Sequence, residues 1–207
     1  MDNALKYKNR EVFFDNLRGV LIILVLIGHF GGDNTGFTRD GNLFLQALEC
    51  FIYIFHMPLM FFISGLFSKK TEKCRNSAFT DLLIPYFVFQ LLYGIVRFLY
   101  DRSTSYLLNP FWPAPALWYL LALFLFRLVL HDFVKLRGAL LIATIISILS
   151  TSLIGLSHIF ALNRVFAYFV FFLFGYYADP QAVLRIKRCF WKKVHTGGGI
   201  ASSQLFP

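Results

Sequence analysis

Long hydrophobic stretches alternate with short polar segments along most of the 207-residue chain. A membrane-spanning helix needs about 20 predominantly apolar residues to cross a hydrocarbon core of about 30 Å. The fourth and sixth stretches are short for that length, although the sixth can be extended by the SHIFALN segment before it. The pattern predicts an all-α, polytopic transmembrane bundle of about six spans. The six stretches are 13–31, 43–67, 82–100, 116–130, 138–157 and 164–178.

Lysine and arginine residues are concentrated in alternate loops, which sets the orientation of this bundle. Cytoplasmic loops of membrane proteins carry an excess of these two residues. One side carries fourteen of them, whereas the opposite loops hold only Arg39 and Arg102. The alternation predicts six spans with both termini in the cytoplasm. The fourteen residues are Lys6, Lys8, Arg10, Lys69, Lys70, Lys73, Arg75, Lys135, Arg137, Arg185, Lys187, Arg188, Lys192 and Lys193.

The composition favours a membrane protein over other classes. Hydrophobic residues make up 57% of the chain and aromatic residues 19%, with a net charge of +9, which is far from the usage of soluble domains. The positive charge does not indicate nucleic acid, because no basic stripe with interleaved aromatic residues is present. We expect a membrane domain over residues 1–180. Residues 181–207 are expected to form a cytoplasmic tail, basic at first and then containing glycine and serine.

The cysteines and histidines do not have the spacing of a disulfide framework or a metal site. The three cysteines lie in unrelated segments, and the five histidines are scattered. Zinc sites usually bring their ligands from closely spaced pairs along the chain. We therefore expect no bound metal and no resident cofactor.

The first hydrophobic stretch has one competing interpretation. Residues 20–27 resemble the apolar core of a secretory signal peptide behind a positive segment. No small-x-small cleavage site follows, and Asp15, Asn16 and Arg18 interrupt the approach. We therefore expect an uncleaved first span.

Arg18 and His29 are the candidate catalytic residues of this first span. Eleven residues at 100° each end about 20° past three full turns, so both positions share one helix face, roughly 16 Å apart along the axis. Ionisable residues inside a span are costly and point to a functional site. Asp15 is placed for an ion pair with Arg18, three residues apart. The alternatives are that Arg18 snorkels to the inner interface and that His29 is a polar residue at the outer end.

The second span carries Glu49 and His56, seven residues apart and again near one face. Pro58 follows inside the same span, where it removes a backbone hydrogen bond and bends the helix. Such a break near ionisable groups lines a cavity in many membrane proteins. We take both residues as candidate supporting or substrate-binding groups. The alternatives are an outer-interface position for Glu49 and an interhelical hydrogen bond for His56.

The polar segment between the second and third spans, residues 69–81, is a predicted cytoplasmic loop. Lys69, Lys70 and Arg75 are its candidate ligands for a nucleotide-like phosphate, because their side chains are charge-assisted donors. The alternative is that they only set the orientation of the bundle. On the opposite side, Trp112, Trp118 and Tyr119 are expected to form an aromatic belt at the outer interface.

Several motifs together resemble the acyltransferase 3 family of integral membrane acyltransferases. Its Arg-x10-His signature is matched by Arg18 and His29 in FFDNLRGVLIILVLIGHF. The resemblance is closest to the branch related to fucose 4-O-acetylase and covers about residues 10–178. The further motifs, in the order of the family, are FHMPLMFFISGLF, LLIPYFVF, LWYLLALF and NRVFAYFVFFLFGYY.

The resemblance implies an O-acyltransferase that moves acetyl from acetyl-CoA, or another acyl group from its CoA thioester, to a sugar hydroxyl. The acceptor would be a cell-surface polysaccharide or glycolipid, and the location the bacterial inner membrane. His29 would be the catalytic histidine, as a base or a transient acyl carrier, and Arg18 its essential partner. Because the two are about 16 Å apart on a straight helix, we assign Arg18 to the donor phosphates or to support through Asp15.

Members of that family usually have about ten spans, whereas six are predicted here. A truncated and inactive acyltransferase is therefore one alternative. A membrane transporter of a lipid or small solute is another, because buried charges also line transport pathways. Binding partners are expected to be acyl-CoA, the glycan acceptor and the lipid bilayer, and not nucleic acid.

Overall fold

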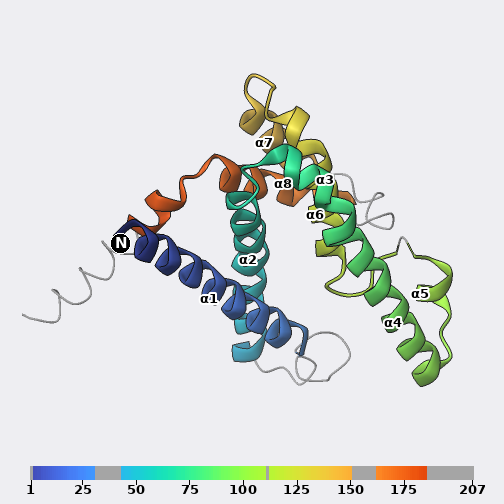
Figure 1. Ribbon diagram of the computed structural model, residues 1–207. Helices are drawn as coiled ribbons and strands as arrows, with labels where there is room; N and C mark the ends of the chain where they lie inside the picture. Colours follow the sequence, from blue (N-terminus) through green and yellow to red (C-terminus); the bar gives the residue numbers. More distant parts are fainter. Residues whose placement is uncertain (1, 31–42, 111, 151–161, 186–207) are drawn as a thin grey trace, which may run out of the picture.

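The computed structural model describes residues 2–30, 43–110, 112–150 and 162–185. All regular elements in these ranges are helical, and none of the described residues forms a strand. Figure 1 shows their arrangement, with α1 crossing α2 and with α4 running away from α2. The elements are α1 (Asp2–Phe30), α2 (Leu43–Leu66), α3 (Thr71–Ala78), the π-helical turn η1 (Phe79–Leu83), α4 (Ile84–Asp101), α5 (Ser105–Leu108), α6 (Trp118–Phe133), α7 (Ala139–Ser150) and α8 (Leu162–Tyr177).

Helix α1 contains the first predicted span but begins well before it, at Asp2. Phe14, Leu21 and Gly28 are buried, and their spacing of seven residues places them on one face. This face packs against α2. The large apolar residues between them, such as Ile23 and Leu26, are exposed, as expected of a helix that contacts lipid.

Helices α2 and α8 cross at two glycines. A Cβ atom at Gly65 would overlap the Phe172 carbonyl oxygen, and one at Gly175 would overlap the Phe62 carbonyl oxygen. Small residues at such crossings let two backbones approach closely in membrane proteins. Around the crossing, Phe61 is fully buried in the main hydrophobic core. The backbones of α2 and α8 are therefore packed closely at this crossing.

The predicted loop over residues 69–81 was wrong for most of its length. Thr71–Asp101 is one continuous helical segment, made of α3, η1 and α4. The wide turn at η1 precedes Pro85, and within it the Ile84 N–H donates to the Phe79 carbonyl, five residues back. Tertiary contacts explain the helical conformation of these polar residues, because α3 and η1 pack against α6.

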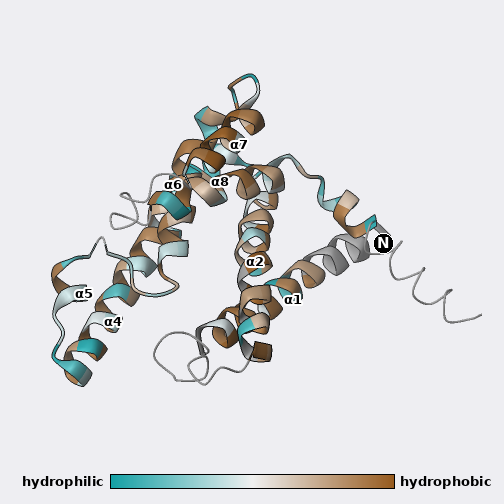
Figure 2. Cartoon of the chain, turned by 180° about the vertical axis from the view of Figure 1, so that it is seen from behind, coloured by the Kyte–Doolittle hydropathy of each residue, from teal (hydrophilic) through white to brown (hydrophobic). Residues whose placement is uncertain are grey.

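Two helical segments are long and apolar enough to cross a membrane, namely Gln46–Leu66 and Thr71–Asp101. They correspond to the second and third predicted spans. Helices α6, α7 and α8 overlap the last three predicted stretches and have 16, 12 and 16 residues, fewer than the about 20 that a span needs. Much of the surface of α2, α7 and α8 is hydrophobic (Figure 2). The all-helical class is confirmed for the described residues, whereas six spans and cytoplasmic termini stay predictions.

Candidate functional site

Arg18 lies at the contact between α1 and the C-terminal end of α2. Its guanidinium carbon is 4.4 Å from the centre of the Phe67 ring, a cation–π geometry. Its Nη1 is 3.4 Å from Asp15 Oδ1, which confirms the predicted pair with Asp15. Phe14 also meets Phe67 edge to face, with ring centres 5.3 Å apart. Arg18 is therefore held between an aromatic ring and a carboxylate, with part of its side chain still exposed.

The side chain of His29 lies outside the described part of the chain, but its backbone belongs to α1. Because α1 is continuous through Phe30, position 29 falls on nearly the same face as position 18, about 16 Å further along the axis. The side chain of Glu49 is likewise not described, and its backbone belongs to α2. The roles of His29 and Glu49 stay predictions.

His56 is buried in the middle of α2, with 1% of its surface exposed. Its Nδ1 is 2.5 Å from the Ile52 carbonyl oxygen, one turn earlier. A carbonyl oxygen can only accept, so Nδ1 carries the hydrogen and donates it. In the neutral ring, the lone pair then lies on Nε2. This hydrogen bond is within α2, whereas the sequence-based alternative was a bond to another helix.

Lys69 binds carbonyl groups at the C-terminal end of α8. Its Nζ donates to the Tyr176 and Ala178 carbonyl oxygens, the latter at 2.7 Å, at a helix end where carbonyls lack intrahelical partners. Burial lowers the pKa of Lys69, and the nearby Asp179 carboxylate opposes this shift. Lys69 thus fastens the C-terminal end of α8 to the segment after α2.

Arg75 is also engaged, in an ion pair that joins α3 to α6. Its Nη1 is 2.9 Å from Asp132 Oδ2. A hydrogen bond from Lys135, supported by the charges of Lys135 and Arg75, lowers the pKa of Asp132. One turn earlier in α3, the Thr71 hydroxyl is 3.0 Å from His131 Nδ1. Arg75 therefore helps to position α3.

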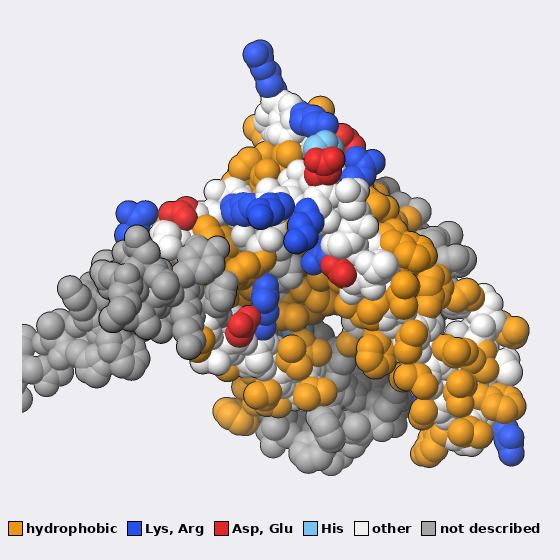
Figure 3. Space-filling view, in the orientation of Figure 1, with side chains coloured by type: hydrophobic (Ala, Val, Ile, Leu, Met, Phe, Trp, Pro, Cys, Tyr) orange, Lys and Arg blue, Asp and Glu red, His pale blue; other side chains and the backbone are white. Residues whose placement is uncertain are grey.

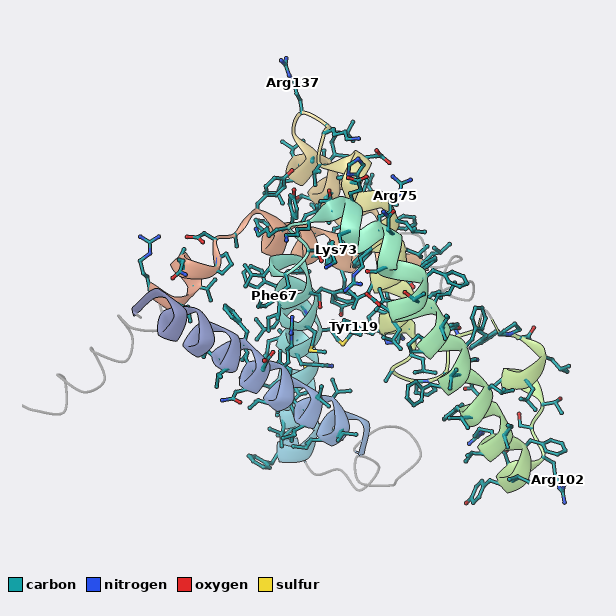
Figure 4. The ribbon with its side chains drawn as sticks, in the orientation of Figure 1. Phe67, Lys73, Arg75, Arg102, Tyr119 and Arg137 are labelled. Carbon is teal, nitrogen blue, oxygen red and sulfur yellow. The ribbon has the colours of Figure 1, made fainter. Side chains whose placement is uncertain are left out.

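Among the predicted phosphate ligands, Lys70 has no ion pair with a described residue, and the same holds for Lys73 in α3. Figure 3 shows lysine and arginine side chains gathered around the C-terminal end of α2 and around α3, above an opening between the α1–α2 pair and α4. Figure 4 shows Phe67, Lys73 and Tyr119 on the side of this opening. The arrangement provides a positively charged mouth with Arg18 at its rim.

Tyr119 contributes a polar group that sequence reasoning placed elsewhere. Its hydroxyl is 2.8 Å from Ser64 Oγ and 3.4 Å from the Met60 carbonyl oxygen. The guanidinium groups of Arg18 and Arg127 both lie within electrostatic range of this hydroxyl. The predicted aromatic belt is wrong for Tyr119 and its neighbour Trp118, because both pack on Phe61 inside the helix bundle.

The sequence predicts the position of Tyr119 only in part. The motif LWYLLALF, which contains Tyr119, belongs to the family resemblance, but its hydrogen-bond partner Ser64 lies 55 residues earlier. The structure therefore brings Ser64 of α2 and Tyr119 of α6 into contact, and Arg18 of α1 contacts Phe67 just after α2. The combination offers a cation for a negatively charged group and hydroxyl donors or acceptors beside it.

Comparisons with known proteins show the family of the chain. The family described as an acyltransferase domain matches residues 11–186. The nodulation protein NolL of Sinorhizobium fredii (strain NBRC 101917 / NGR234) is 31% identical over 193 residues, covering 84% of this chain and 51% of NolL. The chain thus spans about half the length of this relative. No solved structure matches significantly. The chain belongs to the acyltransferase 3 family, as its Arg-x10-His motif and the later motifs indicated.

Proposed function

We propose that the protein is a multi-pass O-acyltransferase of the bacterial inner membrane. It would move acetyl from acetyl-CoA to a sugar hydroxyl of a cell-surface polysaccharide or glycolipid. One observation carries this proposal: in this member of the family, the Arg-x10-His pair lies on a single uninterrupted helix. Its Arg18 contacts Phe67 beside the positively charged mouth, which the proposal places on the inner side. A donor that carries phosphates and comes from the cytoplasm would meet this mouth first.

The proposed reaction needs one base and one anion-binding group. His29 takes the proton of the acceptor hydroxyl while its oxygen attacks the thioester carbonyl. The carbon–sulfur bond then breaks, the imidazolium returns the proton to the CoA sulfur, and the products are the sugar ester and free CoA. The route in which His29 first carries the acyl group gives the same products.

Arg18 is assigned to the donor phosphates in this scheme. A guanidinium group presents a planar set of donors that matches phosphate oxygens. Because Arg18 and His29 are about 16 Å apart along α1, they serve opposite ends of an extended donor. Asp15 orients the guanidinium from one side and Phe67 supports it from the other. Lys70 and Lys73 extend the positive surface beyond it.

The decisive test is acetyl transfer by the full chain in lipid nanodiscs, with radiolabelled acetyl-CoA and a bacterial surface glycan as acceptor. We expect His29→Ala to lower the rate at least about 100-fold, the usual contribution of a catalytic base. His131→Gln is the matched control, because His131 contacts Thr71 at the α3–α6 contact. Transfer by His29→Ala at more than half the wild-type rate would refute the assignment.

A further inference from the structure

Arg127 in α6 is a second guanidinium group close to the positively charged mouth. It lies within electrostatic range of the Tyr119 hydroxyl, and Figure 4 shows Tyr119 and Phe67 on the side of the opening. The Arg18 guanidinium lies within range of the same hydroxyl and over the Phe67 ring. The hydrogen bond from Ser64 to Tyr119, at 2.8 Å, holds α2 and α6 together at this point. Two guanidinium groups from two helices therefore approach one hydroxyl group at the mouth.

Each of these guanidinium groups has one carboxylate partner. Arg127 Nη1 is 3.4 Å from Asp81 Oδ2, and Arg18 Nη1 is 3.4 Å from Asp15 Oδ1. The side chains of Asp81 and Asp15 are 53% and 68% exposed, and such exposed ion pairs contribute little to stability. Neither arginine has a second ion pair among the described residues. A more highly charged anion can therefore replace each carboxylate.

Asp81 lies in the π-helical turn η1, which packs against α6. Turns of this kind are rare in helices and frequently occur at functional sites. The contact between this segment and α6 does not depend on Asp81 alone. Arg75 and Asp132 form a shorter ion pair between α3 and α6, at 2.9 Å, and α3 itself packs against α6. Asp81 can therefore leave Arg127 while the helices stay together.

We propose that Arg127 and Arg18 together bind the diphosphate of the CoA donor, and that Asp81 occupies Arg127 until the donor replaces it. A diphosphate carries its charge on two neighbouring phosphate groups, so each guanidinium group can bind one of them with its planar set of donors. Such charge-assisted hydrogen bonds are among the strongest in proteins. The inference rests on the proposed function, to which it adds a second donor-binding residue and a carboxylate that competes with the donor.

Binding is measured by isothermal titration calorimetry of free CoA with the full chain in phosphatidylcholine nanodiscs. We expect Arg127→Gln to raise the Kd for CoA about tenfold, the cost of one charge-assisted interaction. Asp81→Asn should lower this Kd about threefold, because it removes the competing carboxylate. Pantetheine, which lacks phosphate, should show no difference between these proteins. Lys135→Gln is the control: it removes an exposed positive charge just after α6 and should change the Kd for CoA less than about twofold.

The opposite signs of the two effects separate a phosphate ligand from a purely structural ion pair. If Arg127 only fastened η1 to α6, Arg127→Gln and Asp81→Asn would break the same pair and would change the Kd for CoA in the same direction. That result, or an unchanged Kd in Arg127→Gln, would overturn the assignment. If Arg127→Gln does not fold, Asp81→Asn decides alone, because CoA binding that is unchanged or weaker in this variant would also overturn it.

Lipid headgroups offer the same phosphate chemistry as CoA, and a second set of nanodiscs separates the two sources. If added phosphatidylglycerol removes the difference between the wild type and Arg127→Gln, Arg127 binds lipid headgroups and the donor assignment is overturned.

The binding experiment also separates this inference from the proposed function. CoA binding with both expected effects, but without acetyl transfer to a glycan, would refute the proposed function and leave the phosphate site standing. Acetyl transfer by a protein whose Kd for CoA does not respond to Arg127→Gln would overturn the phosphate site alone.

Discussion

Arg18 illustrates how a charged residue is accommodated at a contact between two largely apolar helices. The face of Phe67 and the Asp15 carboxylate each stabilise the guanidinium, so the charge does not depend on water alone. The sequence-based alternative was that Arg18 merely snorkels to the interface. The partly exposed side chain is compatible with that position, but its contact with α2 also gives it a fixed direction.

Replacing Arg18 by lysine tests the assignment to the donor phosphates. Lysine keeps the charge but loses the planar fork and most of the stacking on Phe67. We expect the KM for acetyl-CoA to rise about tenfold in Arg18→Lys, the cost of one charge-assisted interaction, with kcat changed much less. Steady-state kinetics in nanodiscs measure both quantities. The control is Arg137→Ala, which removes an exposed charge from the turn between α6 and α7. An unchanged KM for acetyl-CoA in Arg18→Lys would contradict the assignment.

At the scale of elements, the sequence predicts helix positions better than helix limits. The stretch 43–67 nearly coincides with α2 (Leu43–Leu66), because its apolar run ends at polar residues on the inner side. The start of the third helix was missed by about eleven residues. TEKCRNSA has no hydrophobic period, and it is helical because α3 packs against α6, where Arg75 pairs with Asp132, 57 residues later. A local pattern does not contain that contact.

The α2–α8 crossing gives a prediction for stability at this scale. Gly65→Ala and Gly175→Ala each place a methyl group against a backbone carbonyl of the other helix. We expect each to lower the free energy of unfolding by about 1–3 kcal/mol, the range for overpacked positions. Gly19→Ala is the control, because nothing lies within 4 Å of its Cβ position. Thermal unfolding in detergent measures the difference, and equal melting temperatures for all three variants would contradict a tight crossing.

At the scale of the whole molecule, the candidate site was predictable in part. The Arg18–His29 spacing follows from helical geometry alone, and the structure keeps both on one continuous helix. The contact of Tyr119 with Ser64 and the binding of Lys69 to carbonyl groups at the end of α8 were not predictable. Each depends on contacts between residues more than 50 positions apart, which arise from the packing of α2 with α6 and α8.

The predicted orientation of the spans is open to a direct test. Single cysteines at Arg102 and Arg137 would be introduced after Cys50, Cys74 and Cys189 are replaced by serine. We expect a membrane-impermeant maleimide to label Arg102→Cys in intact spheroplasts, because Arg102 lies in a predicted outer loop. Arg137→Cys should react only after permeabilisation, because it belongs to the positively charged inner side. The reverse labelling pattern would contradict cytoplasmic termini.

The close approach of the α2 and α8 backbones at Gly65 and Gly175 also has a consequence for motion. Two helices whose main chains touch, with Lys69 fastening the end of one to the segment after the other, have little freedom to slide or separate. They form the stationary frame of the protein. On the proposed function, we therefore expect a rearrangement that admits an acyl donor to move other helices, such as α1, against this frame.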